Sequence, residues 1–509
     1  MYKHTIFFIF LLCATEHAYS QNLSKSEKTV LSETEREKTL RLPKSDAHYM
    51  EISRYIEDEP DSDYRHASEA AYESFRDIKF SIRIIWGVYS KWGIEASWPM
   101  LDMPAEKKQE YQNLYKTFNP VKFDANEWMK FFKRSGIQAF ALITKHHDGF
   151  SLWHTKTRVK QRANFLNPTE NVIEPCDLAY SIEDTPFKRD IVKELCDAAH
   201  KRGIKIDLYF SHPDWYDADF RPYNYHPLAT PDILEHPENY YNPNIHGYNN
   251  RKVIPTPETT PEERQRMVAR HREQIHELLT NYGKVDMMCF DQWLSKDNWP
   301  DLKKTIKLAR KWSPETMFRA RGIGNYGDYY QPEQFVPKGA ESSGMPWMSI
   351  CLLGNNFSYD PVAEHYKGAR WIIRNLIDCV AKGGSFMVCV SPDEFGEFHP
   401  KAVEQLEEVG QWLKINGNGI YETRAREEWK SGDFYFTRSK DSKTLYAFTE
   451  KWTDGEIIIP SITPRKGSKA YLFGNKKPLK WTQTADGVRI KMPAGKPCEY
   501  AWGFQFEVD

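Results

Sequence analysis

Short apolar runs alternate with amphipathic helical stretches between Phe80 and Ile415, and this alternation restricts the fold more than any other feature of the chain. Each apolar run has the length of a buried strand, and each following stretch has the spacing of a helix with one apolar face. Repeated strand-then-helix units predict parallel strands joined by crossover helices. The predicted elements are Phe80–Trp86, Glu127–Ser135, Ala139–Thr144, Asp190–Lys201, Ile204–Phe210, Pro261–Tyr282, Val285–Phe290, Leu302–Lys311, Met317–Arg321, Ala369–Ala381, Ser385–Val390 and Lys401–Ile415.

The number of units favours the α/β class and a TIM-like (β/α) barrel over an open sheet. They extend over roughly 340 residues, which suits a barrel with eight strands. A doubly wound fold is the main rival, but no GxGxxG follows the first predicted strand. Units six and seven are hard to recognise, so we expect the barrel to be irregular there.

After Glu422 the pattern changes to short β runs separated by Gly, Asn, Asp and Pro. Such runs predict a C-terminal antiparallel β-sandwich. The predicted strands are Asp433–Thr437, Leu445–Thr449, Glu456–Ile459, Lys469–Leu472 and Val488–Met492. We therefore divide the chain into a signal peptide (1–20), an N-terminal arm without an assigned role (21–75), a catalytic barrel (76–418) and a β-sandwich domain (419–509).

The first twenty residues have the layout of a secretory signal peptide. Lys3 precedes an apolar run over 6–14, and small residues at Ala18 and Ser20 suit cleavage. A lipoprotein signal at Cys13 is weaker, because the bulky Leu12 precedes it. No other stretch is apolar and long enough to cross a bilayer. The sequence predicts a secreted or periplasmic protein without membrane insertion.

Charge and cysteine content exclude several classes of protein. With 70 Lys and Arg against 71 Asp and Glu, the net charge of −1 gives no electrostatic reason to expect nucleic acid as a partner. The seven cysteines after the signal are scattered and form no CxxC pair, so neither a zinc site nor a disulfide framework is indicated. One disulfide remains possible, and the oligomeric state is open.

Ionisable and aromatic residues follow the predicted strands. In a barrel, the carboxyl ends of the strands and the loops after them form the catalytic face. The second strand leads into His146 and His147, the fourth ends on Asp291, and the fifth leads to Arg321 and then Glu333. We expect these side chains to meet on one rim.

Each candidate also has a less specific interpretation. A carboxylate such as Asp291 after a buried strand is desolvated unless a partner such as Arg321 lies beside it, and the pair could be only a structural salt bridge. His146 and His147 lack further ligands at a suitable spacing for a metal site. Neutral imidazoles that bind sugar hydroxyls fit better, and a structural hydrogen-bond network is the alternative.

Retaining glycoside hydrolysis needs two carboxyl groups about 5–5.5 Å apart, one as nucleophile and one as acid and then base. Asp291 and Glu333 could meet in this way, and Glu341 is a second candidate for the acid/base. Sequence spacing cannot decide between the two glutamates, because both lie in loops. The reaction needs no metal or organic cofactor.

Several motifs resemble those of one family. They are Thr144–Phe150 with Trp153, Phe118-Asn119-Pro120, Trp86–Ser90, Leu208–Ser211 with Asp214-Trp215-Tyr216, Phe290-Asp291, and Gly410–Leu413 with Asn416-Gly417. From about Phe80 to Arg424 the chain resembles the α-L-fucosidases of glycoside hydrolase family 29, and the downstream β region is also similar. The resemblance implies a retaining enzyme that acts on carbohydrate, with Asp291 as nucleophile. It further implies substrate contacts from His146, His147, Trp86, Tyr209, Arg321 and Trp293.

The acid/base position varies within that family. Some members place it in a loop that matches Gly327–Glu333, and others use a Glu after Trp. Here Trp347 is followed by Met348, so Glu333 is preferred.

Two residues depart from the family pattern in the expected sugar pocket. Ile85 occupies the position of a sugar-binding His, and Cys289 occupies that of a Trp two residues before the nucleophile. A sugar hydroxyl left unpaired at Ile85 would cost about 1–3 kcal/mol. We therefore expect an exo-acting enzyme for a terminal α-L-fucose, a modified fucose or a related L-sugar such as L-galactose. Another α-L-glycosidase and a non-catalytic glycan-binding protein are the alternatives.

Overall fold

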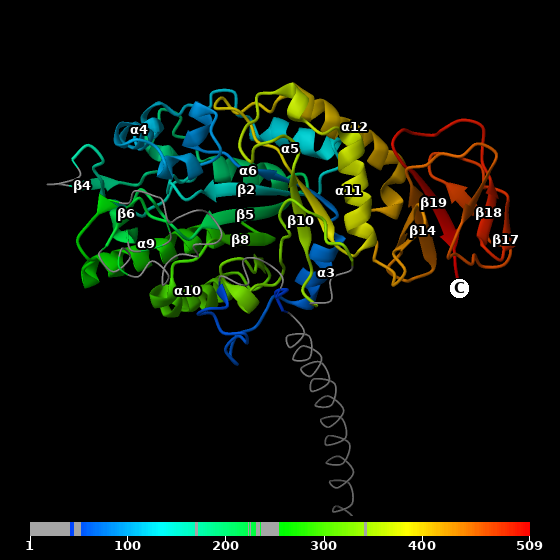
Figure 1. The fold of residues 1–509 in the computed structure, drawn as a ribbon, viewed down its shortest axis with the longest axis horizontal. Coiled ribbons are helices and arrows are strands. Elements are labelled where there is room, and N and C mark those ends of the chain that lie inside the picture. Colours follow the sequence, from blue (N-terminus) through cyan, green and yellow to red (C-terminus); the bar gives the residue numbers. More distant parts are fainter. Residues whose placement is uncertain are drawn as a thin grey trace, which may run out of the picture.

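The fold is that of a computed structural model, which describes residues 41–44, 52–167, 172–221, 223, 225–230, 235, 254–339 and 344–509. The predicted signal peptide and Glu341 lie outside the described residues. Of the predicted N-terminal arm, 41–44 and 52–75 are described. The described chain forms a barrel and, beyond helices α11 (Ala369–Ala381) and α12 (Pro400–Asn416), a group of antiparallel strands (Figure 1).

Seven parallel strands form the main sheet. They are β1 (Phe80–Ile84), β2 (Ala139–Lys145), β5 (Lys205–Ser211), β8 (Met287–Asp291), β9 (Met317–Arg319), β10 (Met348–Leu352) and β11 (Ser385–Cys389). Their order in the sheet is β10-β11-β1-β2-β5-β8-β9. Every residue of β1, β2, β8, β9 and β11 is buried, as expected where a parallel sheet is covered on both faces.

An extended segment, 329–333, closes the sheet into a barrel. Parallel bridges join Arg319 to Tyr329 on the β9 side, and Tyr330 to Trp347 and Glu333 to Ile350 on the β10 side. The segment therefore occupies an eighth strand position, sixth in chain order, and the predicted TIM-like barrel is confirmed. Within the described residues between β9 and β10 there is a short 3-10 turn, Gly324–Tyr326, but no α-helix. This is why the strand-then-helix alternation could not be recognised there.

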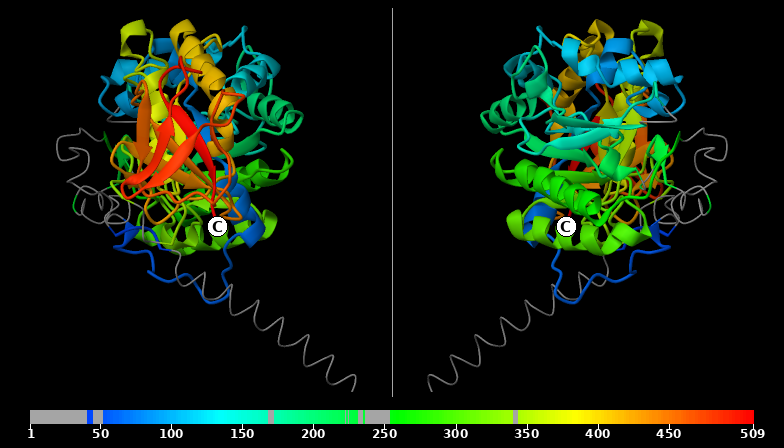
Figure 2. Two further views of the ribbon diagram at one scale, coloured as in Figure 1. Left: turned by 90° about the vertical axis from the view of Figure 1, so that its right-hand side faces the viewer. Right: turned by 90° about the vertical axis from the view of Figure 1, so that its left-hand side faces the viewer.

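Five helices connect the other strands and a sixth follows the last of them, and together they surround the sheet as the pattern predicts (Figures 1 and 2). They are α5 (Ala125–Arg134), α6 (Ile191–His200), α9 (Pro261–Thr280), α10 (Trp299–Trp312), α11 and α12. Local sequence sets their starts. Asp124 caps α5 and Asp190 caps α6, while Thr260 and Glu263 form a capping box at the start of α9.

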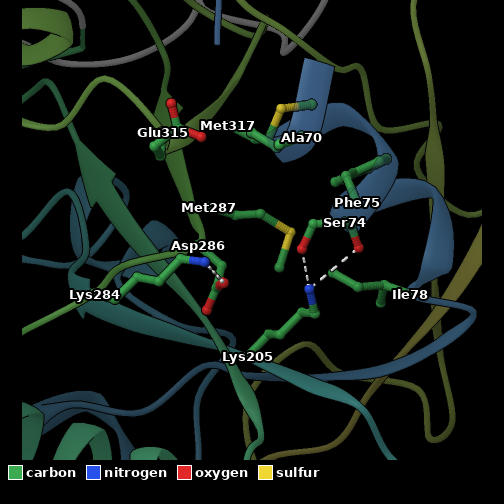
Figure 3. A pocket seen from close by; sticks show the side chains of 11 residues that line it. Ala70, Ser74, Phe75, Ile78, Lys205, Lys284, Asp286, Met287, Glu315 and Met317 are labelled. Atoms are coloured by element: carbon green, nitrogen blue, oxygen red, sulfur yellow. Dashed lines mark hydrogen bonds and ion pairs between the residues drawn. The ribbon is translucent and has the colours of Figure 1, made fainter. Parts of the chain in front are cut away.

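Helix α3 (Glu69–Asp77) lies against the amino ends of β5, β8 and β9. A pocket of about 90 Å³ separates its residues Ala70, Ser74 and Phe75 from those strands (Figure 3). The Lys205 ammonium group spans this pocket and donates to the Ser74 carbonyl oxygen at 3.2 Å. The described part of the N-terminal arm is thus packed on the barrel rather than separate from it.

The C-terminal strands form two facing antiparallel sheets. The five-stranded sheet has the order β12-β13-β14-β19-β16 and the three-stranded sheet β15-β18-β17. A separate apolar core, which includes Phe436, Val488 and Phe504, lies between them. The strands are β12 (Lys430–Ser431), β13 (Phe434–Arg438), β14 (Thr444–Thr449), β15 (Glu456–Ile459), β16 (Ala470–Leu472), β17 (Trp481–Thr484), β18 (Gly487–Lys491) and β19 (Trp502–Glu507).

The β-sandwich prediction is confirmed, although β12, β17 and β19 were not foreseen. The sandwich is tied to the barrel through α12, where the Trp412 indole N–H donates to the Ala501 carbonyl oxygen at 2.8 Å. The remaining elements are α4 (Ala105–Tyr111) and the two-stranded pairs β3 (Val159–Ala163) with β4 (Ile173–Leu178) and β6 (Leu228–Ala229) with β7 (Ile254–Pro255).

Three properties of the described residues concern membranes, metals and disulfides. None of their helices combines the length and apolar character needed to span a membrane. No group of three or more His, Cys, Asp or Glu side chains among them could hold a metal ion. The seven cysteines after the predicted signal are free thiols.

Replacing Gly410 by alanine should destabilise the barrel. A Cβ at this position of α12 would lie 1.9 Å from the Arg134 carbonyl oxygen at the end of α5, so the two helices would have to separate. We expect a loss of about 1–3 kcal/mol, measured by urea unfolding of the barrel.

Gly339→Ala is the control, because no described atom lies within 4 Å of the Cβ that it adds. Equal unfolding midpoints for the two variants would show that the contact between α5 and α12 is not close.

Candidate active site

Asp291 is the last residue of β8 and is almost fully buried at the carboxyl end of the strands. The chain turns sharply after it, because Gln292 has a left-handed backbone with φ 63°. Gly322 faces this turn, and a Cβ there would lie 2.0 Å from the Gln292 carbonyl oxygen. A non-glycine residue with positive φ is a strained conformation that often occurs at functional sites. Here the left-handed residue directly follows Asp291.

Three side chains surround the Asp291 carboxylate. The Arg321 Nε lies 2.8 Å from Oδ1, close enough for an ion pair although the N–H is not aligned as a hydrogen bond. The Tyr209 hydroxyl donates to Oδ2, and the His147 Nε2 lies 3.8 Å from the same oxygen. Burial alone would raise the pKa of Asp291, but the charges of Arg321 and Arg319 and the hydrogen bond from Tyr209 outweigh it. The pKa is held well below its usual range, so this carboxyl group is ionised at neutral pH.

Glu333 shares Arg321 with Asp291. The Arg321 Nη1 donates to the Glu333 Oε2 at 2.6 Å, and the Arg319 Nη2 lies 3.8 Å from the same oxygen. The following residue, Gln334, also has a left-handed backbone, with φ 67°. The Glu333 side chain is 29% exposed, against 6% for Asp291, so solvent reaches only one carboxyl group freely. One guanidinium therefore holds two carboxyl groups of different accessibility.

The two adjacent histidines lie beside Asp291, with ring centroids 4.1 Å apart. His146 shares a hydrogen bond between its Nδ1 and the Ser97 hydroxyl. Neither ring nitrogen of His147 has a hydrogen-bond partner among the described residues, although both are buried. Burial lowers the pKa of His146 to about 3 and that of His147 well below its usual value. Both imidazoles are neutral at neutral pH, and His147 has two nitrogens available for a ligand.

Aromatic side chains line the same region. The Trp98 ring lies 4.6 Å from His147 and 5.5 Å from Trp215, measured between centroids. Tyr225 lies 6.2 Å from Trp98 and 5.9 Å from Trp293 in the same measure. Trp293 thus lies where the sequence placed it, at the edge of the site. Trp98 and Tyr225 were missed, although a Trp in the loop after the first barrel strand could have been noted as a rim residue.

Trp86 lies in a different environment from the one expected. It packs against Phe118, Phe123 and Trp128, and its indole N–H donates to the Asp393 carbonyl oxygen at 2.9 Å. These contacts place it in an aromatic cluster beneath the rim. The structure brings together Asp291, Glu333, Arg321, His146, His147 and Tyr209, with Trp293 at the edge, but no described contact joins Trp86 to them.

The two residues that depart from the family pattern lie at β1 and β8, which β2 and β5 separate in the sheet. Ile85 follows β1, and its backbone N–H donates to the Ser391 hydroxyl at 2.9 Å. Cys289 lies two residues before Asp291, and its Sγ accepts from the Arg319 Nη1 at 3.1 Å. The Arg83 guanidinium lies 5.3 Å from the centroid of the Tyr209 ring. Beneath the carboxyl groups the barrel therefore holds two buried arginines, Arg83 and Arg319.

Two carboxyl groups on one arginine, at the open end of a barrel with aromatic walls, are the equipment of a glycoside hydrolase. The family model described as Alpha-L-fucosidase matches residues 53–418, and the model for the Alpha-L-fucosidase C-terminal domain matches residues 427–507. The chain belongs to the α-L-fucosidase family. It is accordingly an enzyme, and the resemblance noted in the sequence is confirmed.

Relatives in other organisms match most of the chain. The plasma alpha-L-fucosidase of Pongo abelii is 25% identical over 468 residues, which cover 84% of this chain and 88% of that protein. The structure of alpha-L-fucosidase isoenzyme 1 from Paenibacillus thiaminolyticus has a TM-score of 0.69 at 24% identity, over 87% of this chain and 99% of the other. A Bacteroides thetaiotaomicron alpha-L-fucosidase, solved as a trapped covalent intermediate, has a TM-score of 0.66 at 22% identity, over 88% and 98% of the two chains.

Buried neutral histidines should make the protein less stable in acid. Burial lowers the pKa of His226 to about 3, and its Nδ1 accepts the Leu228 backbone N–H at 3.0 Å. In the unfolded chain this imidazole takes up a proton below about pH 6.5, whereas in the folded protein it stays neutral until about pH 3. This difference leaves the free energy of unfolding unchanged above pH 6.5. Below pH 6.5 it lowers the free energy of unfolding by about 1.4 kcal/mol for each pH unit.

His226→Asn keeps an acceptor for that N–H and has no titrating group. Between pH 6 and 4, we expect the free energy of unfolding of the variant to fall less steeply than that of the wild type, by about 1.4 kcal/mol for each pH unit. Urea unfolding at a series of pH values measures both slopes. Parallel curves would contradict the lowered pKa of His226.

Proposed function

We propose that this enzyme is an exported, retaining exo-glycosidase that removes a terminal α-L-fucose or a closely related L-sugar from glycans. The proposal rests on two contacts of the Arg321 guanidinium. Its Nε lies 2.8 Å from the Asp291 Oδ1, and its Nη1 lies 2.6 Å from the Glu333 Oε2. Because both carboxyl groups bind one guanidinium, they lie at the same place on the rim, where two groups can act on one glycosidic bond. The covalent intermediate of the Bacteroides thetaiotaomicron relative is what a retaining enzyme forms, and membership of the same family supports the same chemistry here.

In the first step, the ionised Asp291 attacks the anomeric carbon and forms a covalent glycosyl ester. Glu333 gives its proton to the glycosidic oxygen, so the bond to the aglycone breaks as the aglycone alcohol leaves. In the second step, Glu333 takes a proton from water, which attacks the anomeric carbon and releases Asp291. Arg321 stabilises the Asp291 carboxylate before attack, and the contact weakens as its charge is transferred.

The histidines and the aromatic residues suit sugar recognition. His147 supplies two unsatisfied, neutral ring nitrogens for hydroxyl groups. The rings of Trp98 and Trp293 offer apolar faces to the C–H surfaces of a sugar. Tyr209 orients the nucleophile through its hydroxyl. Trp86 then acts through packing beneath the rim, because its described contacts are with Phe118, Phe123 and Trp128.

A related L-sugar is the second candidate for the glycone. Ile85 has no side-chain donor, and Cys289 is small and binds Arg319 instead of forming an aromatic wall. A pocket altered at both positions favours a modified fucose or L-galactose over plain L-fucose.

Hydrolysis of aryl α-L-fucoside, α-L-galactoside and a D-sugar control tests the proposal. We expect turnover of at least one L-sugar, and a loss of at least about a thousandfold in kcat/KM for Asp291→Ala. Asp177→Ala is the matched control and should leave kcat/KM unchanged, because among the described residues Asp177 pairs with the exposed side chains of Arg158 and Lys160. Activity that survives in Asp291→Ala would rule out this nucleophile.

The same panel tests the role of Ile85. If the missing donor at this position limits turnover, Ile85→His should raise kcat/KM for the L-fucoside by about tenfold, since it adds one hydrogen bond. An unchanged kcat/KM would show that Ile85 does not limit recognition of this sugar.

Export is the second part of the proposal. Its support is the signal-like sequence over 1–20 and the relative from Pongo abelii, which is named a plasma enzyme. Expression of the full chain in a secreting host should give extracytoplasmic protein whose N-terminal sequence begins at Gln21. Removal of residues 2–20 should leave the protein in the cytoplasm. Cytoplasmic protein that retains residues 1–20 would contradict export.

A further inference from the structure

The chain from Arg321 to Glu333 carries two residues of the site but lacks the usual support of a barrel strand. Each of the six helices described above follows a strand and covers the sheet from outside. The described residues between β9 and β10 include no such helix, and 329–333 is held in the barrel by bridges at Tyr329, Tyr330 and Glu333. Something else must fix this segment, because an error of about 1 Å at a catalytic group can cost a hundredfold in rate.

The described N-terminal residues contact the start of this segment. Ile52 and Ile56 pack beside Gly324, where an added Cβ would lie 3.0 Å from the Ile56 Cγ2. The Leu42 backbone N–H donates to the Asn325 Oδ1 at 2.8 Å, and the His66 Nε2 lies 2.9 Å from the Asn325 carbonyl oxygen. The 3-10 turn Gly324–Tyr326 is therefore enclosed by residues that lie more than 250 positions earlier in the chain.

Tyr64 continues these contacts. Its hydroxyl donates to the Tyr326 carbonyl oxygen at 2.6 Å, and the two rings meet edge to face at 4.9 Å between centroids. The Tyr326 hydroxyl in turn donates to the Asp61 Oδ1 at 3.1 Å and accepts the Asp61 backbone N–H at 3.0 Å.

Asp328 is fully buried and forms a second set of contacts with the N-terminal residues. Its Oδ1 accepts the Ala67 backbone N–H at 3.0 Å and the Tyr72 hydroxyl at 3.1 Å. Its Oδ2 accepts from the Arg310 guanidinium of α10 and from the Phe318 backbone N–H of β9. One carboxylate thus joins the N-terminal residues to α10, β9 and the start of the sixth strand.

The same N-terminal residues are tied to α10, the helix that follows the Asp291 strand. Asp61 forms ion pairs with Lys303 and Lys307, and Glu57 pairs with Lys303 at 2.8 Å. The Glu57 carboxylate also accepts the Trp299 indole N–H at 2.8 Å. Through these pairs the N-terminal residues connect the chain after Asp291 with the chain before Glu333.

We propose that residues 52–72 are a positioning element that takes the place of the missing crossover helix and holds Glu333 at its working distance from the substrate. The inference rests on the proposed role of Glu333 as acid/base. Tyr64, Tyr72 and Asp328 are positioning residues, because they act on Glu333 through the backbone of 326–333 and do not touch the substrate.

A purely structural role predicts a different result. Loss of general stability reduces the active fraction of enzyme, and this affects all substrates equally. Misplacement of Glu333 affects only substrates whose leaving group needs a proton. The phenol of a phenyl glycoside needs this proton to leave. The dinitrophenolate of a dinitrophenyl glycoside leaves as a stable anion without it. The ratio of their kcat/KM values, which report the first step, separates the two roles.

The experiment uses the full mature chain with Tyr64→Phe, Tyr72→Phe and the double variant. Tyr421→Phe is the matched control, because the Tyr421 hydroxyl also donates to a backbone carbonyl oxygen, that of Gly136, at 2.6 Å. In the double variant we expect kcat/KM for the phenyl glycoside to fall about tenfold while that for the dinitrophenyl glycoside changes less than about twofold. Tyr421→Phe should leave the ratio unchanged, and thermal unfolding midpoints show whether the variants are folded.

Glu333→Gln identifies which hypothesis fails. Glu333→Gln could lose kcat/KM selectively on the phenyl glycoside while the double tyrosine variant loses it equally on both glycosides. That result would overturn the positioning element alone. Equal losses on both glycosides in Glu333→Gln itself would overturn the acid/base assignment and the inference that depends on it.

Discussion

A parallel sheet can form a barrel only if its two edge strands are joined, and here a polar, proline-containing segment joins them. Without 329–333, the facing edges of β9 and β10 would expose unpaired N–H and C=O groups in the interior of the protein. The segment satisfies these groups although Pro332 has no N–H to donate. Its closure also places Glu333 on the rim beside Arg321. Both the architecture and the pairing of the two carboxyl groups therefore depend on one short extended segment.

Inside the barrel, the ionisation state of a side chain depends on the side chains that it contacts rather than on solvent. Asp291 is buried, and burial opposes its charge, so its ionised form depends on Arg321 and the neighbouring groups. The same burial keeps His146 and His147 neutral, because protonation would add uncompensated charge. One low-dielectric environment thus provides both an anionic nucleophile and uncharged hydrogen-bonding imidazoles. The difference arises from which side chain lies next to a guanidinium.

The amino-acid pattern was sufficient to predict most of the fold. Ala369–Ala381 was predicted with the bounds that the structure has, and Asp291 lies at a strand end as expected, because apolar periodicity and capping residues are local signals. The sixth strand was missed because 329–333 has neither alternation nor a following helix. Trp86 was expected in the site, yet its contacts lie in an aromatic cluster, since a motif identifies a residue but not the direction of its ring. The proximity of Asp291 and Glu333 follows from closure of the barrel, which no local window of sequence contains.

The neighbouring positions of β1 and β11 also have a consequence for how the protein is made. Phe80 pairs with Phe386 and Arg83 with Cys389, so strands about 300 residues apart in the chain lie side by side. During synthesis, the apolar edge of β1 has no partner on that side until the ribosome has produced β11. Pairings of such long range are slow to form, and the exposed edge can meanwhile bind other chains. We expect the nascent barrel to depend on chaperones that shield apolar strands, and the yield of folded enzyme to depend on how long that edge stays open.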